Sequence, residues 1–160
     1  MKSIQIEKFG GPEVLVIKDV NIAKPGPKEV LIKNKSIGLN FIDVYHRTGL
    51  YPIPLPSGIG LEASGVIEEI GSEVKLFKVG DRVTHASMPI GAYSEKQIMP
   101  EEKLISVPDG ISDEVASCIT LKGITAEYLL HRAYPLKKGD KVCFIMLQLE
   151  LLVKSYVLGL

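Results

Sequence analysis

Alternating apolar and polar residues, interrupted by frequent turn-forming residues, dominate the chain up to about residue 110. The alternation over residues 3–9 and 15–20, on either side of Gly10-Gly11-Pro12, predicts a β-hairpin. Phe41, Val44 and Tyr45 fall at helical spacing and predict a short helix over residues 40–47. Further strands are predicted at residues 29–36, 65–70, 82–86 and 91–99, with a proline-rich loop at residues 49–60. Short strands with many turns are typical of a β-barrel-like domain.

The pattern changes beyond residue 110. Ser112 can cap a helix at residues 113–118, with two acidic residues in its first turn, and a second helix is predicted at residues 125–133. An apolar strand is predicted at residues 141–145. Two helices followed by a buried-type strand indicate the start of a parallel α/β domain. The predicted fold is therefore mainly β with some α, divided into a β-rich domain at residues 1–124 and a second part at residues 125–160.

Charge and composition exclude several classes of partner. Nineteen basic and nineteen acidic residues give a formal net charge of zero, which favours neither nucleic acid nor an anionic membrane surface. The apolar stretch at residues 142–160 contains Gln148, Glu150 and Lys154, which argue against a membrane span. A strand pattern begins at once at the N-terminus, so no secretory signal is expected, and the two cysteines are interpreted as buried thiols of a reducing compartment. The expected location is the cytoplasm.

Several sequence segments resemble one known family. They are GLNFID (38–43), GLYP (49–52), PSGIGLEASG (56–65), GDRV (80–83), GAY (91–93) and KGITA (122–126). In this order they are similar to the quinone oxidoreductase (ζ-crystallin-like) branch of the medium-chain dehydrogenase/reductase superfamily. The resemblance implies a GroES-like β-barrel domain followed by a Rossmann domain, of which this chain holds only the truncated start. It also implies hydride transfer from NADPH to a quinone or an α,β-unsaturated carbonyl, and full-length members that are often homodimers.

The resemblance further implies a zinc-free site. In the zinc-dependent members, a cysteine and a histidine occupy the positions that match Asn40 and Leu61, and neither of these residues is a ligand that zinc prefers. Two cysteines are too few for a four-cysteine structural zinc lobe. The histidines, His46, His85 and His131, show no ligand spacing and are interpreted as ordinary surface or partly buried side chains. No metal site is predicted.

Without zinc, hydrogen-bond donors have to hold the cofactor and polarise the carbonyl. By resemblance, the candidate catalytic residues are Asn40, Tyr45 and Tyr51, and the candidate cofactor-binding residues are Asn40, Tyr45, Gly123 and Thr125. Each polar candidate has a structural alternative. Asn40 can satisfy backbone groups in its turn, Tyr45 can pack at the edge of the core, and Tyr51 is either a lid over a ligand or a plug against the barrel.

Two acidic residues in the same segments have structural interpretations. Asp43 can cap the short helix or order Arg47, four residues further on. Glu62 falls where the zinc enzymes keep an acid behind the metal ligands, and here it is expected to order its loop.

The C-terminal segment departs from the family pattern. After Phe144 the family continues with a glycine-rich turn that receives the cofactor's diphosphate at a helix start, whereas residues 145–160 hold one glycine, Gly159. With common codons chosen for residues 145–153, a shifted reading frame gives His-Ala-Ala-Ala-Gly-Val-Ala-Gly, which is close to that turn. We therefore expect a frameshift just after Phe144.

Three functional hypotheses remain open at this point. In the first, the chain is a working NADPH-dependent quinone or enone oxidoreductase. In the second, which we favour, it is the N-terminal domain of such an enzyme, weakly active or inactive alone, because it lacks the main contacts to the nucleotide. NADPH oxidation with a simple quinone or enone separates these two, so whether this chain acts as an enzyme is open. In the third, it is a GroES-like binding module without redox activity, which would have no need of Asn40, Tyr45 and Tyr51 together with the segment 122–125.

Overall fold

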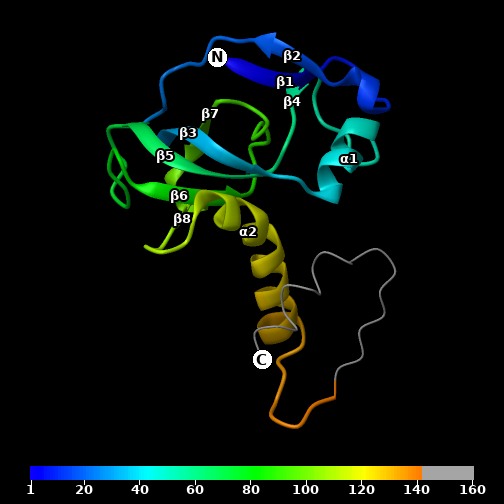
Figure 1. The fold of residues 1–160 in the computed structure, drawn as a ribbon, viewed down its shortest axis with the longest axis vertical. Coiled ribbons are helices and arrows are strands. Elements are labelled where there is room, and N and C mark those ends of the chain that lie inside the picture. The colour runs from blue at the N-terminus through cyan, green and yellow to red at the C-terminus, as the bar shows by residue number, and fades with distance from the viewer. Residues whose placement is uncertain (142–160) are drawn as a thin grey trace. The chain divides into compact units, whose positions relative to one another are not determined.

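The computed structural model describes residues 1–141. By their contacts, the residues group into two compact units, Met1–Cys118 and Ile119–Leu160. The first unit is β-rich, and its strands belong to two antiparallel sheets (Figure 1). The division at residue 124 proposed from the sequence stays a prediction.

The smaller sheet has the strand order β2-β1-β4. Its strands are β1 (Lys2–Ile6), β2 (Val16–Asp19) and β4 (Ser57–Gly58). β1 and β2 pair antiparallel, with Ser3 opposite Lys18, which confirms the predicted hairpin. A short 3-10 turn at Pro12–Val14 lies between them and buries Val14.

The larger sheet has the strand order β7-β3-β5-β6-β8, and every pairing in it is antiparallel. Its strands are β3 (Glu29–Gly38), β5 (Glu62–Ile70), β6 (Arg82–Ala86), β7 (Lys96–Pro100) and β8 (Ile105–Ser106). A bridge between Ser3 and Ser94 links it to the smaller sheet. Its buried core comprises Val30, Ile32, Ile67, Val83, Met99 and Leu104. The alternation of apolar residues therefore predicted β3, β5 and β6, although β5 begins three residues earlier than predicted. β8 was not predicted, because two residues are too few to show an alternation.

The strand predicted at residues 91–99 is wrong in its first half. Regular pairing begins only at Lys96. Gly91 has a φ of 131°, and its N–H donates to the carbonyl of Gly60. The Ser94 hydroxyl lies 2.7 Å from the carbonyl oxygen of Gly91 and 2.8 Å from that of Lys96. These contacts fold residues 91–95 into a loop whose alternation resembles that of a strand.

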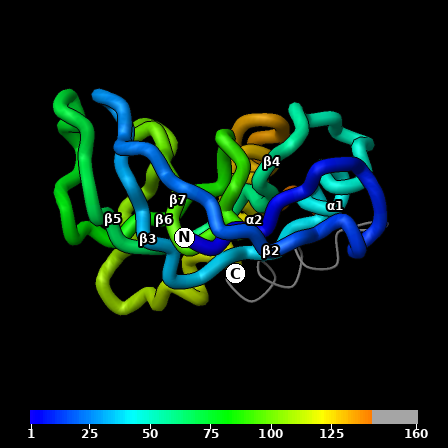
Figure 2. The backbone as a smooth tube through the Cα atoms, turned by 90° about the horizontal axis from the view of Figure 1, so that it is seen from above, coloured from blue at the N-terminus to red at the C-terminus, as the bar shows by residue number. Residues whose placement is uncertain are grey.

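The predicted short helix is present as α1 (Phe41–Thr48), with Asn40 as its N-cap. It ends at Gly49, whose φ of 82° is the left-handed conformation that glycine adopts without strain. A Cβ at Gly49 would also lie 2.9 Å from the ring of Phe9, so this turn requires glycine for two reasons. α1 lies at the opposite end of the β-rich unit from the turn between β5 and β6 (Figure 2).

The two helices predicted after Ser112 are one helix. α2 runs from Asp113 to Glu127 without a break and continues into a π-helical turn at Tyr128–Ala133. Its start is capped as expected, because the Val115 N–H donates to Ser112 Oγ at 3.3 Å. The predicted interruption was wrong because a single interior glycine, Gly123, costs only about 1 kcal/mol and cannot by itself end a helix. The strand predicted at residues 141–145 lies outside the described residues except for Lys141, and the frameshift expected after Phe144 lies wholly outside them.

Candidate functional site

Asn40 and Asp43 form a capping box at the start of α1. The Asn40 N–H donates to Asp43 Oδ2 at 3.0 Å, and the Asp43 N–H donates back to the Asn40 carbonyl at 3.0 Å. The capping alternative for Asp43 is therefore confirmed. Arg47 instead donates from Nη1 to the carbonyl of Gly10 at 3.2 Å. Asn40 also has the structural role that the sequence allowed, because it holds the first turn of the helix.

The side chain of Asn40 has a second anchor, in the neighbouring strand. Its Nδ2 donates to Glu62 Oε2 at 2.8 Å. Glu62 begins β5, is fully buried, and pairs with Gly38 across the sheet. A Cβ at Gly38 would lie 2.7 Å from Glu62 Oε2, so the absence of a side chain there leaves room for the carboxylate. Glu62 thus contacts the residue predicted to touch the ligand, which goes beyond ordering its own loop.

Tyr45 and Tyr51 lie together beside α1. Their rings meet edge to face with centroids 5.4 Å apart, and the Tyr51 N–H donates to the Tyr45 carbonyl at 3.1 Å. Tyr51 is 51% exposed, so it does not plug the barrel, and Tyr45 is half-buried. The structure brings these two candidates into contact with each other, and it places Asn40 at the start of the helix that carries Tyr45.

Asp43, a buried acid in the first turn of α1, is hydrogen-bonded to a tyrosine outside the helix. Tyr93 donates from its hydroxyl to Asp43 Oδ2 at 2.8 Å. Burial raises the pKa of Asp43, and the hydrogen bond from Tyr93 partly opposes that rise. Burial beside Asp43 also raises the pKa of Tyr93. Gly60 lies close to the Tyr93 ring, since a Cβ there would lie 2.2 Å from Cδ1. In the sequence, Tyr93 stands out only as part of the GAY segment, and no role was predicted for it.

The remaining candidates, Gly123 and Thr125, lie in the second unit, on α2. Thr125 Oγ1 donates to the carbonyl of Leu121 at 2.8 Å, so its hydrogen serves the helix. A Cβ added at Gly123 would meet no heavy atom within 4 Å, so the helix backbone is open on this side. An accessible backbone at Gly123 is compatible with close approach of a flat ring.

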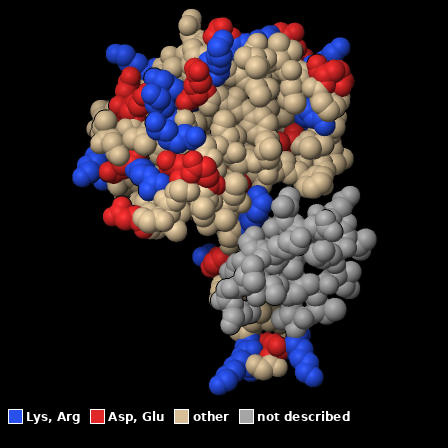
Figure 3. Space-filling model, in the orientation of Figure 1, with Lys and Arg blue, Asp and Glu red and all other residues tan. Residues whose placement is uncertain are grey.

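Exposed apolar side chains flank both ends of α1. Leu39 and Phe41 are exposed at its start, and Leu50 is exposed just after its end. Charged side chains gather over the left part of the visible face of the β-rich unit and at its right edge, and a broad area without them lies between (Figure 3). This face therefore suits an apolar or uncharged partner better than a polyanion.

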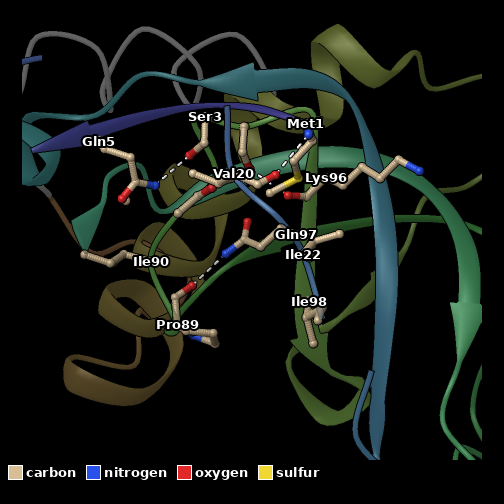
Figure 4. A pocket seen from close by; sticks show the side chains of 13 residues that line it. Met1, Ser3, Gln5, Val20, Ile22, Pro89, Ile90, Lys96, Gln97 and Ile98 are labelled. Carbon is tan, nitrogen blue, oxygen red and sulfur yellow. Dashed lines mark hydrogen bonds between the residues drawn. The ribbon is translucent and has the colours of Figure 1, made fainter. Parts of the chain in front are cut away.

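A separate hollow of about 230 Å³ lies between β1 and β7 (Figure 4). Gln97 forms part of its wall, and its Nε2 donates a hydrogen bond to the carbonyl of Pro89 at 2.8 Å. The residues that line it are Met1, Ser3, Gln5, Val20, Ile22, Gly58, Pro89, Ile90, Gly91, Ser94, Lys96, Gln97 and Ile98. None of the predicted site residues lines this hollow.

Three side chains differ from their sequence-based interpretation. Cys118 is exposed and free, whereas a buried thiol was expected, because it lies on the outward face of α2; Cys143 lies outside the described residues. His46 and His85 are buried, and His85 is only 1% exposed, because it follows Val83 on the inward face of β6. Within residues 1–141, no three His, Cys, Asp or Glu side chains gather as a metal would require. In the same residues, no helix has the length and hydropathy of a membrane span.

Comparison with known proteins shows the family to which the domain belongs. Residues 26–135 match the alcohol dehydrogenase GroES-like domain family. The chain is 54% identical to a quinone oxidoreductase of Pseudomonas aeruginosa over 89% of its own length, and 45% identical to quinone oxidoreductase 1 of Escherichia coli over 88%. These matches span 44% and 43% of those proteins, so the chain covers less than half the length of the curated relatives it matches.

Solved structures give the same result. A quinone oxidoreductase of Pseudomonas syringae pv. tomato superimposes with a TM-score of 0.84 at 51% identity, over 87% of this chain and 43% of that one. An Escherichia coli quinone oxidoreductase, solved in complex with NADPH, superimposes with a TM-score of 0.84 at 46% identity, over 86% and 42%. The chain therefore belongs to the alcohol dehydrogenase GroES-like domain family, in the quinone oxidoreductase branch of the medium-chain dehydrogenase/reductase superfamily.

Proposed function

We propose that this chain is the N-terminal, substrate-side part of an NADPH-dependent quinone or enone oxidoreductase. The observation that carries the proposal is the arrangement around α1, where Asn40 caps the helix and bonds to buried Glu62, and where Tyr45 and half-exposed Tyr51 lie together. These amide and hydroxyl groups are donors suited to a carboxamide or a carbonyl oxygen. The NADPH complex of the Escherichia coli relative supports the choice of cofactor.

The described residues fit the reactive end of such a cofactor. When bound, NADPH supplies the hydride, and the protein supplies orientation and exclusion of water. In the proposed site, Asn40 and Tyr45 orient the nicotinamide, and Tyr51 covers the ligand and donates to the carbonyl. On α2, the backbone of Gly123 and Thr125 stay proposed as cofactor contacts, and the Thr125 hydroxyl hydrogen is already engaged by the Leu121 carbonyl.

For the diphosphate end of the cofactor we propose no comparable set of binding residues in this chain. The sequence carries no G-x-G-x-x-G pattern, which in this superfamily opens the helix that receives the diphosphate. We therefore propose that the chain by itself binds NADPH weakly and turns it over slowly or not at all. The alternative of a GroES-like binding module without redox activity predicts no effect of NADPH in any context.

We also propose that the chemistry proceeds without zinc. At the two positions that match the zinc ligands, Leu61 carries no donor atom and is buried, and the amide nitrogen of Asn40 is hydrogen-bonded to Glu62. Neither side chain is a thiolate or imidazole ligand. The substrate class we propose is a small uncharged quinone or α,β-unsaturated carbonyl, which suits the apolar surroundings of α1. A homodimeric full-length protein and a cytoplasmic location complete the proposal.

The test uses the 160-residue chain and a chimera. In the chimera, residues 1–135 are joined to the matching C-terminal remainder of the Pseudomonas aeruginosa relative, which restores a nucleotide-binding domain. We expect NADPH oxidation with 1,4-benzoquinone or a simple enone from the chimera, and little or none from the chain alone. A folded chimera that binds NADPH and reduces neither type of substrate would contradict the proposal.

Variants of the chimera test the individual residues. We expect Asn40→Ala to lower kcat/KM by about 10²-fold, the effect of removing one preorganised donor, and Tyr51→Phe to lower it by about tenfold. Lys24→Ala, at an exposed position, serves as the control and should leave turnover unchanged. Loss of activity in the control to the same extent would indicate a general effect on folding.

A further inference from the structure

Tyr93 contacts three separate parts of the β-rich unit. Its N–H donates to the carbonyl of Ile59 at 2.9 Å, and its own carbonyl accepts the N–H of Ile4, in β1, at 2.8 Å. Gly60 leaves room for its ring, because a Cβ at that position would lie 2.2 Å from Cδ1. The backbone and the ring of Tyr93 are therefore held by β1 and by residues 59–60, and only its hydroxyl reaches α1.

The hydroxyl of Tyr93 bonds to the first turn of α1. It donates to Asp43 Oδ2 at 2.8 Å, and the same oxygen atom accepts the N–H of Asn40 at 3.0 Å. Asp43 is 4% exposed, and the backbone of Leu61 and the charge of His46 also act on its carboxyl group. Hydrogen bonds to buried carboxylates are among the stronger ones in proteins, so the bond from Tyr93 helps to hold the start of the helix.

Helix α1 in turn places both tyrosines of the candidate site. Tyr45 lies in α1, two residues after Asp43, and the Tyr51 N–H donates to the Tyr45 carbonyl at 3.1 Å. The two rings meet with centroids 5.4 Å apart. A displacement of the helix would therefore carry both hydroxyl groups with it. Misplacing a reacting or orienting group by about 1 Å can lower a rate by about 10²-fold.

We propose that Tyr93 is a positioning residue for the reaction assigned above: it holds Asp43, and with it the start of α1, so that the two tyrosines of the candidate site keep their place beside the bound ligand. This inference rests on the proposed function. Tyr93 acts through α1 and does not itself touch the ligand. It shares the task with the other bonds of Asp43 and with Arg47, which donates to the Gly10 carbonyl near the end of the helix. Loss of the Tyr93 hydroxyl should therefore loosen the helix without unfolding the domain.

The first test is amide hydrogen exchange of the 160-residue chain, without any cofactor. Tyr93→Phe removes the hydroxyl and keeps the ring. We expect the backbone amide protons of Tyr45 and Tyr51 to exchange about tenfold faster in this variant, because opening of α1 then breaks one hydrogen bond fewer. Ser64→Ala is the matched control, because it removes a buried hydroxyl that donates to the Val83 carbonyl in β6. It should leave the same two protons within about threefold of the unmodified chain.

Kinetics of the chimera provide the second test, with rates expressed per NADPH-binding site so that unfolded protein does not count. We expect Tyr93→Phe to lower kcat by about tenfold and to leave KM for NADPH within about threefold, because the restored domain supplies the contacts to the diphosphate. Ser64→Ala should leave both constants unchanged. A residue that only stabilised the fold would change neither constant per binding site.

Three results would overturn the proposal. The first is that the Tyr45 and Tyr51 amide protons of the unmodified chain exchange as fast as that of the exposed Asn21, which can be measured even if Tyr93→Phe does not fold. The others are unchanged exchange of these protons in a folded Tyr93→Phe chain and an unchanged kcat in the folded chimera. An inactive chimera, together with amide protons that respond to Tyr93→Phe, would instead contradict the proposed function, because the exchange measurement needs no turnover.

Discussion

A Cβ at Gly38 would lie 2.0 Å from the carbonyl oxygen of Ser117, so the end of β3 and the start of α2 meet at a distance that only glycine permits. Ser117 is itself fully buried, and its hydroxyl bonds to that of Ser36 at 2.7 Å. The close approach of Gly38 to Ser117 therefore joins the larger sheet to α2, and the absence of a side chain at Gly38 also leaves room for Glu62.

Replacing Gly38 by alanine should force these elements apart. We expect Gly38→Ala to lower the free energy of unfolding by about 2–3 kcal/mol, the usual effect of overpacking against backbone. Urea unfolding followed by circular dichroism measures it. Gly123→Ala is the matched control, because a Cβ there meets nothing within 4 Å, and it should stabilise α2 by up to about 1 kcal/mol. Equal effects of the two substitutions would contradict the steric argument.

Asp113 connects three elements of the β-rich unit. Its Oδ1 accepts a bond from Arg82 Nη2 at 3.0 Å and one from Ser64 Oγ at 2.9 Å. Because this pair is partly shielded from water, we expect Asp113→Ala to destabilise the chain by about 2 kcal/mol. Asp19→Ala breaks the exposed pair with Lys2 and should cost less than about 1 kcal/mol. The midpoints of urea unfolding of the two variants provide the comparison.

His85 should make stability depend on pH in the acid range. Burial lowers the pKa of His85 from 6.5 to about 4, so the folded chain holds a neutral imidazole where the unfolded chain binds a proton. The unfolded state therefore binds more protons between these two values, and the free energy of unfolding falls as the pH is lowered from about 6.5 to about 4. The total effect is on the order of 3 kcal/mol. His85→Leu should flatten the profile in this window; an unchanged profile would show that another group is responsible.

Asp43 should act in the opposite direction. Its pKa is raised by burial, so the folded state binds a proton more readily than the unfolded chain. The free energy of unfolding therefore falls as the pH rises from the pKa of Asp43 in the unfolded chain to its higher pKa in the folded chain. Tyr93→Phe removes the bond that opposes the rise, and should therefore raise the pKa of Asp43 further. The difference in the free energy of unfolding between the variant and the unmodified chain should be largest near neutral pH and should become smaller in acid. Carbon NMR titration of the Asp43 carboxyl group checks the shift directly, with Tyr128→Phe, at an exposed tyrosine, as the control.

The sequence predicted the local elements well where side-chain period and burial agree. β6 was placed at its observed bounds, and α1 was recognised from Phe41, Val44 and Tyr45. The inward position of His85 was available from the same pattern, because it follows Val83 at a spacing of two in a strand. Histidine is a polar side chain that is less often fully buried than the apolar residues, which concealed that signal.

The Asn40–Glu62 contact could not be predicted in this way. It depends on the register between β3 and β5, which shifts between Asn34 and Ser36 through an irregularity in the pairing. A shift of one residue exchanges the two faces of a strand, so the alternation alone does not show which side chains meet across the sheet. The resemblance supplied Asn40, Tyr45 and Tyr51 as candidates; their contacts came from the structure.

The continuity of α2 has a practical consequence for anyone who wishes to study the β-rich unit alone. Proteolysis after Cys118, or a stop codon placed there, would end the chain inside α2. The last carbonyl groups of the shortened helix would then lose their hydrogen-bond partners. A fragment that ends shortly after Ala133, where the helical stretch stops ahead of Pro135, would keep those bonds intact. Such a fragment is the better candidate for crystallisation trials.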